Sequence, residues 1–290
     1  MERFKTLEVG LLKPNIYSVA LNRPKKLNAF NGDMWVEIKE CFEWLNKQGD
    51  CRAIVLSANG RMFTAGVDLQ TFASIAGEEE TDESRSGDET NSDDVARKGL
   101  QIYSIGRLWQ DAMSSLENCS RPIIACSHNG CIGAGLEMVS AADIRFVTAD
   151  GYYQYKEGDV GMAADVGGLQ RFPKIVGNQS LVRELVFTGR KLLPEEALRL
   201  GLVSRVCKDK DDMLAEAVKV AEQIAAKSPI ATVGAKKFLN YTRDHNVADS
   251  LEYAIAWNMA MLQGSDMLRA MQGAMTKSKV SYPRLPNSKL

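Results

Sequence analysis

The sequence predicts an α/β fold, because short apolar strand patterns alternate with helical patterns up to about residue 160. Residues 16–21, 52–58 and 122–127 are short apolar runs, and each leads into a loop of polar residues or glycine. Between the first two runs, residues 34–48 place apolar side chains at helical spacing. Strands separated by helices form βαβ units, in which a mainly parallel sheet carries its ligand loops at the carboxyl ends of the strands.

The later part of the chain divides into a core, a helical region and a tail. Further predicted elements of the core are a helix at 136–142 and strands at 143–149 and 152–155. Five helical patterns then follow, at 181–189, 194–201, 212–227, 229–244 and 250–263. Pro194 stands where the second of these helices would begin, and Gly201 where it would end. We therefore expect a core of residues 1–205, a C-terminal helical subdomain of residues 206–280 and a tail of residues 281–290.

Residues 77–94 (GEEETDESRSGDETNSDD) form a single low-complexity acidic run. Such a composition buries too little apolar surface to offset the entropy of ordering, so we expect a mobile surface insertion. Cation binding or regulation is the alternative, and charge runs of this kind are more often simply solvated.

The composition excludes several classes of protein. The 290 residues carry a net charge of −1 with a pI near 6.2, which gives no electrostatic footprint for nucleic acid. No apolar run reaches the roughly 18 residues that a membrane span needs, and we expect no secretory leader. The six cysteines show no CxxC spacing and there are only two histidines, so we expect reduced, mostly buried thiols and no metal site.

An apolar stripe in the last predicted helix has two interpretations. Ile255, Met259 and Leu262, with Trp257 nearby, are more often intrachain core than interface. A subunit contact is the alternative, because five consecutive helices must be covered.

The chain ends in Ser288-Lys289-Leu290, after a segment at 281–287 that we expect to be loose and to present these residues. A C-terminal S-K-L is read by a receptor as a peroxisomal address. We expect location in the matrix of a peroxisome or related microbody, with the import receptor as a partner.

Three acidic residues stand in apolar, glycine-rich surroundings: Glu137, Glu157 and Asp165. Partial burial raises the pKa of a carboxyl group and makes it useful for moving protons near neutral pH. Structural alternatives are capping of a helix near residues 166–168 by Asp165 and a surface charge for Glu157. Two other acids, Asp143 and Asp159, are expected to be structural or turn residues.

Two backbone segments offer hydrogen-bond donors for a developing negative charge. Gly66 follows a strand, which points the Val67 N–H toward the ligand loops, and Ala134 lies at a predicted helix start between Gly133 and Gly135. Free amides of this kind stabilise an oxyanion. Together with acids for proton transfer, they indicate chemistry next to a carbonyl group.

These motifs resemble the crotonase superfamily, the enoyl-CoA hydratase/isomerase fold, over nearly the whole chain. The similar segments are 20–30 (ALNRPKKLNAF), 61–69 (RMFTAGVDL), 121–146 and 176–206. The resemblance implies a spiral of ββα units with a C-terminal helical subdomain, assembled as a homotrimer or homohexamer.

The resemblance also implies roles for particular residues. The backbone N–H groups of Val67 and Ala134 would polarise an acyl-CoA thioester carbonyl, and Ala134 stands where the family usually has Gly. The oxyanion and substrate-binding segment comprises Ala65, Gly66, Val67, Asp68 and Leu69. The CoA-binding loop comprises Arg23, Lys25, Lys26 and Leu27, with ordinary solvated side chains as the alternative for its cations.

The spacing of the acids distinguishes subfamilies. Glu137 and Glu157 are twenty positions apart, as are the two glutamates of the hydratases. Asp165 lies eight positions after Glu157, and the segment 156–171 (KEGDVGMAADVGGLQR) closely resembles the Δ3,5-Δ2,4-dienoyl-CoA isomerases. In these enzymes the residues matching Glu157 and Asp165 transfer the protons, whereas an Asp stands at the position of Glu137.

The subfamily resemblance implies conversion of 3,5-dienoyl-CoA to 2,4-dienoyl-CoA in fatty-acid β-oxidation. It implies no cofactor, since coenzyme A is part of the substrate. A 2-enoyl-CoA hydratase using Glu137 and Glu157 is the first alternative, and a non-catalytic acyl-CoA-binding protein is the second.

Overall fold

The computed structural model describes residues 4–68, 70–71 and 94–287. Leu69, residues 77–93 of the acidic run and the terminal Ser288-Lys289-Leu290 therefore lie outside the described residues.

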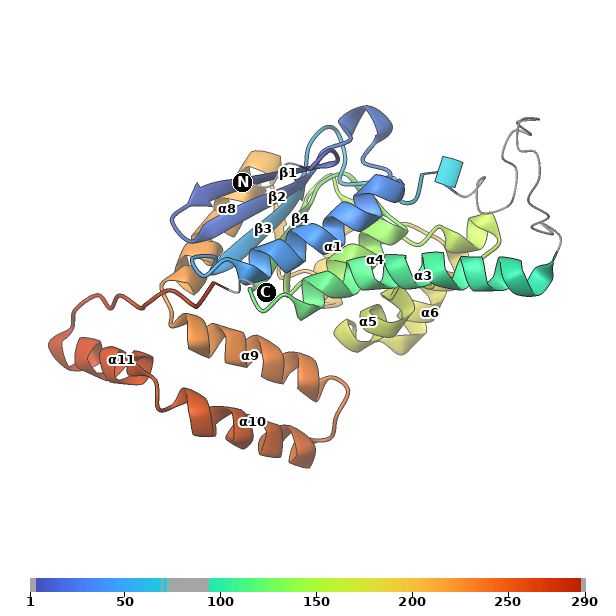
Figure 1. The fold of residues 1–290 in the computed structure, drawn as a ribbon. Coiled ribbons are helices and arrows are strands. Elements are labelled where there is room, and N and C mark those ends of the chain that lie inside the picture. Colours follow the sequence, from blue (N-terminus) through green and yellow to red (C-terminus); the bar gives the residue numbers. More distant parts are fainter. Residues whose placement is uncertain (1–3, 69, 72–93, 288–290) are drawn as a thin grey trace.

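A six-stranded sheet forms the centre of the molecule (Figure 1). In spatial order its strands are β1 (Leu7–Lys13), β2 (Ile16–Leu21), β3 (Ala53–Ala58), β4 (Ile123–Ser127), β6 (Ile144–Thr148) and β8 (Arg205–Cys207). The hairpin of β1 and β2 is antiparallel, and every later pair is parallel. The parallel pairs bring the loops that follow β3 and β4 to the same edge of the sheet.

A second, two-stranded sheet links those loops. It pairs β5 (Gly130–Ile132) with β7 (Tyr152–Gln154) in parallel. Isolated bridges join Thr64 to Cys131 and Phe30 to Val67. A Cβ on Gly66 would lie 3.2 Å from the Ile132 carbonyl oxygen, so this close approach of two loops favours glycine.

One long helix lies against a face of the sheet, and a second runs alongside the first and extends past the sheet (Figure 1). In α1 (Gly32–Lys47) the N-cap Asn31 accepts a hydrogen bond from the Met34 N–H at 3.2 Å, and the helix buries its apolar stripe in the core. α3 (Val95–Asn118) packs along α1 and buries only its second half, from Trp109 onward. The short α4 (Ala134–Ser140) is buried throughout.

α8 (Lys210–Ala225) supports the sheet through a second apolar cluster. Its Met213, Ala217 and Ala221 pack in one cluster with side chains of the strands, such as Val55 and Ile124. β8 and α8 are thus continuous with the core. The helices that stand away from the sheet begin with α9 (Figure 1).

Five further short helices of the described chain lie in the segments that connect the strands of the core. They are η1 (Pro24–Lys26), η2 (Glu157–Val160), α5 (Gly168–Ile175), α6 (Gln179–Thr188) and α7 (Pro194–Arg199). The prediction that Pro194 begins a helix is confirmed, and Gly201 follows its end with a φ of +79°.

The C-terminal helices are α9 (Pro229–Thr242), α10 (Val247–Met261) and α11 (Ser265–Thr276). α9 is anchored by the buried Lys236, whose ammonium donates to the carbonyls of Leu116 and Arg121 at 3.1 and 3.0 Å and to Asp143 at 2.8 Å. The Leu116 carbonyl is in the last turn of α3, so this donation satisfies a group that a helix end leaves unpaired.

The apolar stripe of α10 is exposed in the single chain. Ile255, Met259 and Leu262 are each more than half exposed, and none of the residues of α10 is buried. The interpretation of this stripe as intrachain core is therefore wrong, because α10 packs against α9 through its other side (Figure 1). A subunit contact stays a prediction.

The segment before the terminal tripeptide is docked on the core. The Leu285 N–H donates to the Gly49 carbonyl at 3.0 Å, the Gly49 N–H donates to Asn287 Oδ1 at 2.7 Å, and Arg52 binds the Tyr282 carbonyl at 2.6 Å. The expectation of a loose segment is wrong here, because these hydrogen bonds to Gly49 and Arg52 hold it.

All six cysteines are buried free thiols, as the composition indicated. Among the described helices, none combines the length and the apolar character that crossing a membrane requires.

Candidate active site

A pocket of about 270 Å³ lies where the loops after β3 and β4 meet the segment after β7. One wall holds the backbone of Ala65, Gly66, Val67, Gly133 and Ala134. Another holds the carboxylates of Glu137, Glu157 and Asp165. Apolar side chains line much of the rest, among them Trp109, Ile132, Val160, Met162 and Val166. The structure thus brings both predicted groups, backbone amides and acids, to one cavity.

The two amide segments are shaped by glycines with positive φ. Gly66 has a φ of +95°, and Gly133, the N-cap of α4, has a φ of +52° with a ψ of −118°. The N–H groups of Val67 and Ala134 have no acceptor among the described residues. They are free to bind an oxygen atom in the pocket.

Glu137 is the most buried of the three acids. It projects from α4, is 2% exposed, and accepts a hydrogen bond from the Gly168 N–H at 3.2 Å. Burial raises the pKa of its carboxyl from 4.5 to about 8, and the charge of Glu157 adds to the rise. Glu137 is therefore predominantly neutral at neutral pH.

Glu157 lies at the first residue of η2, with its carboxylate beside Gly133. A Cβ on Gly133 would lie 2.9 Å from Glu157 Oε1. Burial raises the pKa of Glu157, and the charge of Asp165 adds to the rise, while backbone N–H groups, including that of Lys156 at 2.8 Å, oppose it. This half-buried carboxylate thus faces the amide segments at close range.

Asp165 precedes α5, and its backbone is held by Gln110 Nε2, which donates to its carbonyl at 2.8 Å. The residue is exposed, yet the surrounding protein removes part of its water and raises the pKa of its carboxyl. The N-cap of α5 is Gly167, and no side chain caps the helix. The capping alternative for Asp165 is therefore wrong.

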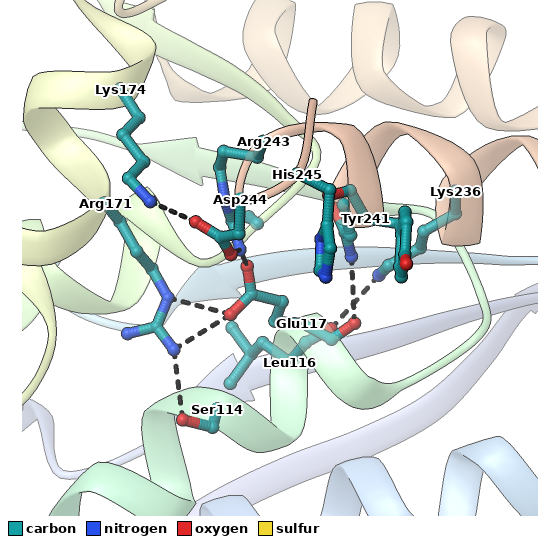
Figure 2. Close-up of polar contacts among 12 residues, drawn as sticks. Ser114, Leu116, Glu117, Arg171, Lys174, Lys236, Tyr241, Arg243, Asp244 and His245 are labelled. Atoms are coloured by element: carbon teal, nitrogen blue, oxygen red, sulfur yellow. Dashed lines mark hydrogen bonds and ion pairs between the residues drawn. The ribbon is translucent and has the colours of Figure 1, made fainter. Parts of the chain in front are cut away.

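Asp165 also borders a second, polar pocket of about 570 Å³. Figure 2 shows the cluster at its wall, in which Glu117 joins three elements. Arg171 of α5 donates to Glu117 at 3.0 Å and to Ser114 at 3.0 Å, and Arg243 beyond α9 pairs with the same carboxylate. Asp165 thus stands between an apolar cavity and a polar one.

The cations of the predicted CoA-binding loop are of two kinds, one with a structural role and two that are exposed. Arg23 pairs with Asp68 at 3.1 Å and binds the Ala29 carbonyl, so its guanidinium holds the loop together. Lys25 and Lys26 are exposed on η1, and Leu27 ends it in a left-handed conformation with a φ of +52°. The two lysines stay candidates for contact with phosphates.

The two other acids have the structural roles expected. Asp143 accepts hydrogen bonds from the Ile123 N–H at 2.7 Å and from Lys236. Asp159 lies in η2, where its N–H donates to the Lys156 carbonyl at 3.1 Å and its carboxylate pairs with Lys156. Asp159 also contributes to the pocket wall, which the sequence did not indicate.

Trp109 is a pocket residue that the sequence analysis missed. It projects from α3 and stacks on Trp35, with ring centroids 4.8 Å apart and planes 10° from parallel. The apolar spacing of Trp109, Ala112, Met113 and Leu116 is the signal that could have identified this helix.

Comparison with known proteins decides the family. A sequence model described as enoyl-CoA hydratase/isomerase matches residues 12–282. The chain belongs to that family.

Members of the enoyl-CoA hydratase/isomerase family with high similarity carry more specific names. The mitochondrial Delta(3,5)-Delta(2,4)-dienoyl-CoA isomerase of Mus musculus is 45% identical over 274 residues, 94% of this chain and 80% of the mouse protein. The peroxisomal protein of that name from Arabidopsis thaliana is 35% identical over 289 residues, 98% of this chain and 99% of the plant protein.

Solved structures agree on the family fold. The enoyl-CoA hydratase of Bacillus anthracis has a TM-score of 0.83 at 23% identity, covering 96% of this chain and 99% of the bacterial one. The predicted α/β crotonase fold is confirmed.

Replacing Glu137 of this family member with Gln should raise thermal stability most at alkaline pH. The folded-state pKa is about 8 against 4.5 for an unperturbed carboxyl, so between these values the folded protein keeps a proton that the unfolded chain has released. Wild-type stability then falls as the pH rises through this window, by up to about 1.36 kcal/mol per pH unit. The Glu137→Gln variant lacks this loss, and Gln still accepts from the Gly168 N–H.

Melting temperatures of both proteins, measured near pH 5 and near pH 9, check this prediction. The advantage of the variant should be large at the higher pH and small at the lower one. An equal difference at both values would contradict it.

Proposed function

We infer that this chain is a Δ3,5-Δ2,4-dienoyl-CoA isomerase of fatty-acid β-oxidation. The observation that carries the inference is a third carboxylate, Asp165, in the pocket of Glu137 and Glu157. Relatives that bear this name are 45% identical over 94% of the chain, which supports the same assignment.

The amides of Val67 and Ala134 would hold the thioester carbonyl oxygen. Removing a proton from C2 moves an electron pair toward that oxygen and generates a conjugated enolate. Hydrogen bonds that are already aimed at the oxygen stabilise this charge without reorganisation, and one such donor contributes about 3 kcal/mol. The free N–H groups on the pocket wall support this role.

Two carboxyl groups would then move the protons. Glu157, in its ionised form, takes the C2 proton, and Asp165, in its protonated form, gives a proton to C6. The carbonyl re-forms, and the double bonds shift from C3=C4 and C5=C6 to C2=C3 and C4=C5. The raised pKa values of both carboxyls favour proton transfer near neutral pH.

Glu137 would tune this pair. Because it is predominantly neutral at neutral pH, it adds no second negative charge beside Glu157 while the enolate forms. The reaction moves protons and double bonds only, so it requires no redox cofactor, and coenzyme A enters as part of the substrate.

A 2-enoyl-CoA hydratase is the second candidate. The observation that favours it is that Glu137 and Glu157, twenty positions apart, line one pocket and interact electrostatically. In that reaction the two glutamates would hold and activate a water molecule, and Asp165 would have no role.

Activity measurements with the purified protein distinguish the two. We expect a 3,5-dienoyl-CoA to give a rise in the absorbance of the conjugated 2,4-diene, with faster turnover than 2-enoyl-CoA or 3-enoyl-CoA esters. Hydration of a 2-enoyl-CoA without any conversion of the 3,5-diene would overturn the isomerase assignment.

We also propose import into peroxisomes or related microbodies through Ser288-Lys289-Leu290, acting at a free carboxyl end. Of the relatives, the plant protein is named peroxisomal and the mouse protein mitochondrial. A fluorescent protein followed by residues 281–290 should colocalise with a peroxisomal marker, and removing Leu290 should disperse it. A mitochondrial or cytosolic signal from the intact tail would contradict the proposal.

A further inference from the structure

Glu137 has a longer side chain than the Asp that stands at this position in the dienoyl-CoA isomerases. The structure shows where the additional methylene group fits. A Cβ placed on Gly168 would lie 2.6 Å from Glu137 Cγ and 3.0 Å from Glu137 Oε1. Real Cβ atoms essentially never approach heavy atoms as closely as the first distance. The absent side chain of Gly168 therefore provides the space that the longer acid occupies.

The same space is bordered by the hydroxyl of Tyr155. Tyr155 Oη and Glu137 Oε1 each lie 3.0 Å from the Cβ position on Gly168. The two oxygen atoms are therefore separated by at most twice that distance. Tyr155 is 3% exposed, and its hydroxyl has no hydrogen-bond partner among the described residues. A buried hydroxyl without a partner is costly, so its retention beside the pocket needs a reason.

The ring of Tyr155 is buried and restrained by packing. It packs edge-on against Phe172 of α5, with centroids 5.7 Å apart. Phe172 thus restrains the ring beside the space that it shares with Glu137. The carboxyl of Glu137 turns about its terminal torsion, which is broad for Glu.

We propose that Tyr155 is a positioning residue for Glu137: its hydroxyl donates a hydrogen bond to the Glu137 carboxyl as that group turns, and Gly168 leaves room for both. The effect on catalysis rests on the proposed isomerase function, whereas the packing of the three residues does not.

The electrostatic consequence follows from the groups around Glu137. Glu157 and Asp165 face it and favour its neutral form, while the N–H groups of Gly168 and Val166 favour its ionised form. A hydroxyl that donates to the carboxylate joins the second set and lowers the pKa of Glu137. Loss of the hydroxyl should raise that pKa.

Tyr155→Phe tests the hydroxyl with little change in shape. If the hydroxyl binds Glu137, kcat should fall about tenfold with KM nearly unchanged, the loss expected for one hydrogen bond to a chargeable group. The alkaline limb of the kcat profile should move to higher pH, and the melting temperature should fall. If the hydroxyl is idle, removing it leaves the pH profile unchanged and keeps or raises the melting temperature, which would overturn the proposal.

Tyr153→Phe is the matched control. Tyr153 is on β7, is fully buried, and its hydroxyl shares a hydrogen bond with Ser127 Oγ at 2.7 Å. Loss of the Tyr153 hydroxyl should lower the melting temperature without moving the pH profile of kcat. The profile thus separates positioning of Glu137 from a general packing defect.

Gly168→Ala tests the shared space without any need for activity. Gly168 begins α5 and has no positive φ, and Ala at such a position reduces the freedom of the unfolded chain. Without a clash the melting temperature should therefore rise. We expect the melting temperature of Gly168→Ala to fall because of the clash. Adding Glu137→Asp and Tyr155→Phe to this variant should restore most of the lost melting temperature. A higher melting temperature in Gly168→Ala, or no recovery in the combined variant, would show that the three residues do not share this space. Absence of isomerase activity in the wild type would instead overturn the proposed function.

Discussion

Asp165→Asn is expected to reduce conversion of a 3,5-dienoyl-CoA by at least about 100-fold, the lower end of what a positioned general acid contributes. Asn has nearly the shape of Asp and has no proton to give to C6 at neutral pH. Because Asp165 is exposed and caps no helix, the melting temperature should stay close to that of the wild type. The rise in 2,4-diene absorbance measures the loss of activity.

Exchange in heavy water separates the two proton transfers of this variant. Glu157 is intact in Asp165→Asn, so the C2 protons of the substrate should still exchange with solvent deuterium while the double bonds stay in place. Glu157→Gln should abolish both the exchange and the shift. Loss of C2 exchange in Asp165→Asn would mean that Asp165, and not Glu157, removes the C2 proton.

Asp159→Asn is the matched control for Asp165→Asn. Asp159 lines the same pocket and pairs with Lys156, but it has a turn role in η2. The substitution makes the same Asp-to-Asn exchange at another carboxyl group of this pocket, six positions before Asp165. A comparable loss of activity in both variants would indicate a general effect of removing a carboxyl group from the pocket and would contradict the role of Asp165 as the acid.

The parts of the site that the sequence predicted are those fixed by local chain conformation. The strand at 16–21 agrees with β2, and the glycines around Val67 and Ala134 mark turns that few other residues adopt. Because parallel strands end at one edge of a sheet, the loops that carry these turns had to lie close together. The three acids follow the same loops into the pocket.

The features that the sequence did not predict depend on which element packs on each helix face. α3 begins at Val95 and leaves its first half exposed, so only its second half has the amphipathic pattern of a packed helix. The stripe of α10 is as apolar as a core face, yet no element of the described chain covers it. Composition shows that a face is apolar, and only the fold shows what packs on it.

Contacts between polar groups that are distant in the sequence could not be predicted either. Arg23 reads as a loop cation, but Asp68, which is 45 positions away, neutralises it. Tyr155 reads as a strand residue, and its position beside Glu137 depends on the meeting of β7, α4 and α5. In both cases the partner is distant in sequence, and local pattern carries no signal for such a contact.

Gly133→Ala is expected to damage both halves of the site at once. The φ of +52° and ψ of −118° at Gly133 lie outside the regions open to residues with a Cβ, so the backbone that aims the Ala134 N–H must change. The added Cβ would also lie 2.9 Å from Glu157 Oε1 and displace the base. Losing one oxyanion donor alone lowers kcat by about 100- to 1,000-fold, and we expect at least that loss in the dienoyl-CoA assay.

Gly161→Ala provides the comparison, since Gly161 also has a positive φ, of +79°, but a Cβ there meets no atom within 4 Å. This control should lose about 1 to 2 kcal/mol of stability from the left-handed backbone and keep most of its kcat. Measuring kcat and the free energy of unfolding for both variants separates backbone strain from damage to the site. If Gly133→Ala lost no more activity than Gly161→Ala, neither the Ala134 amide nor the position of Glu157 beside it would be needed for the reaction.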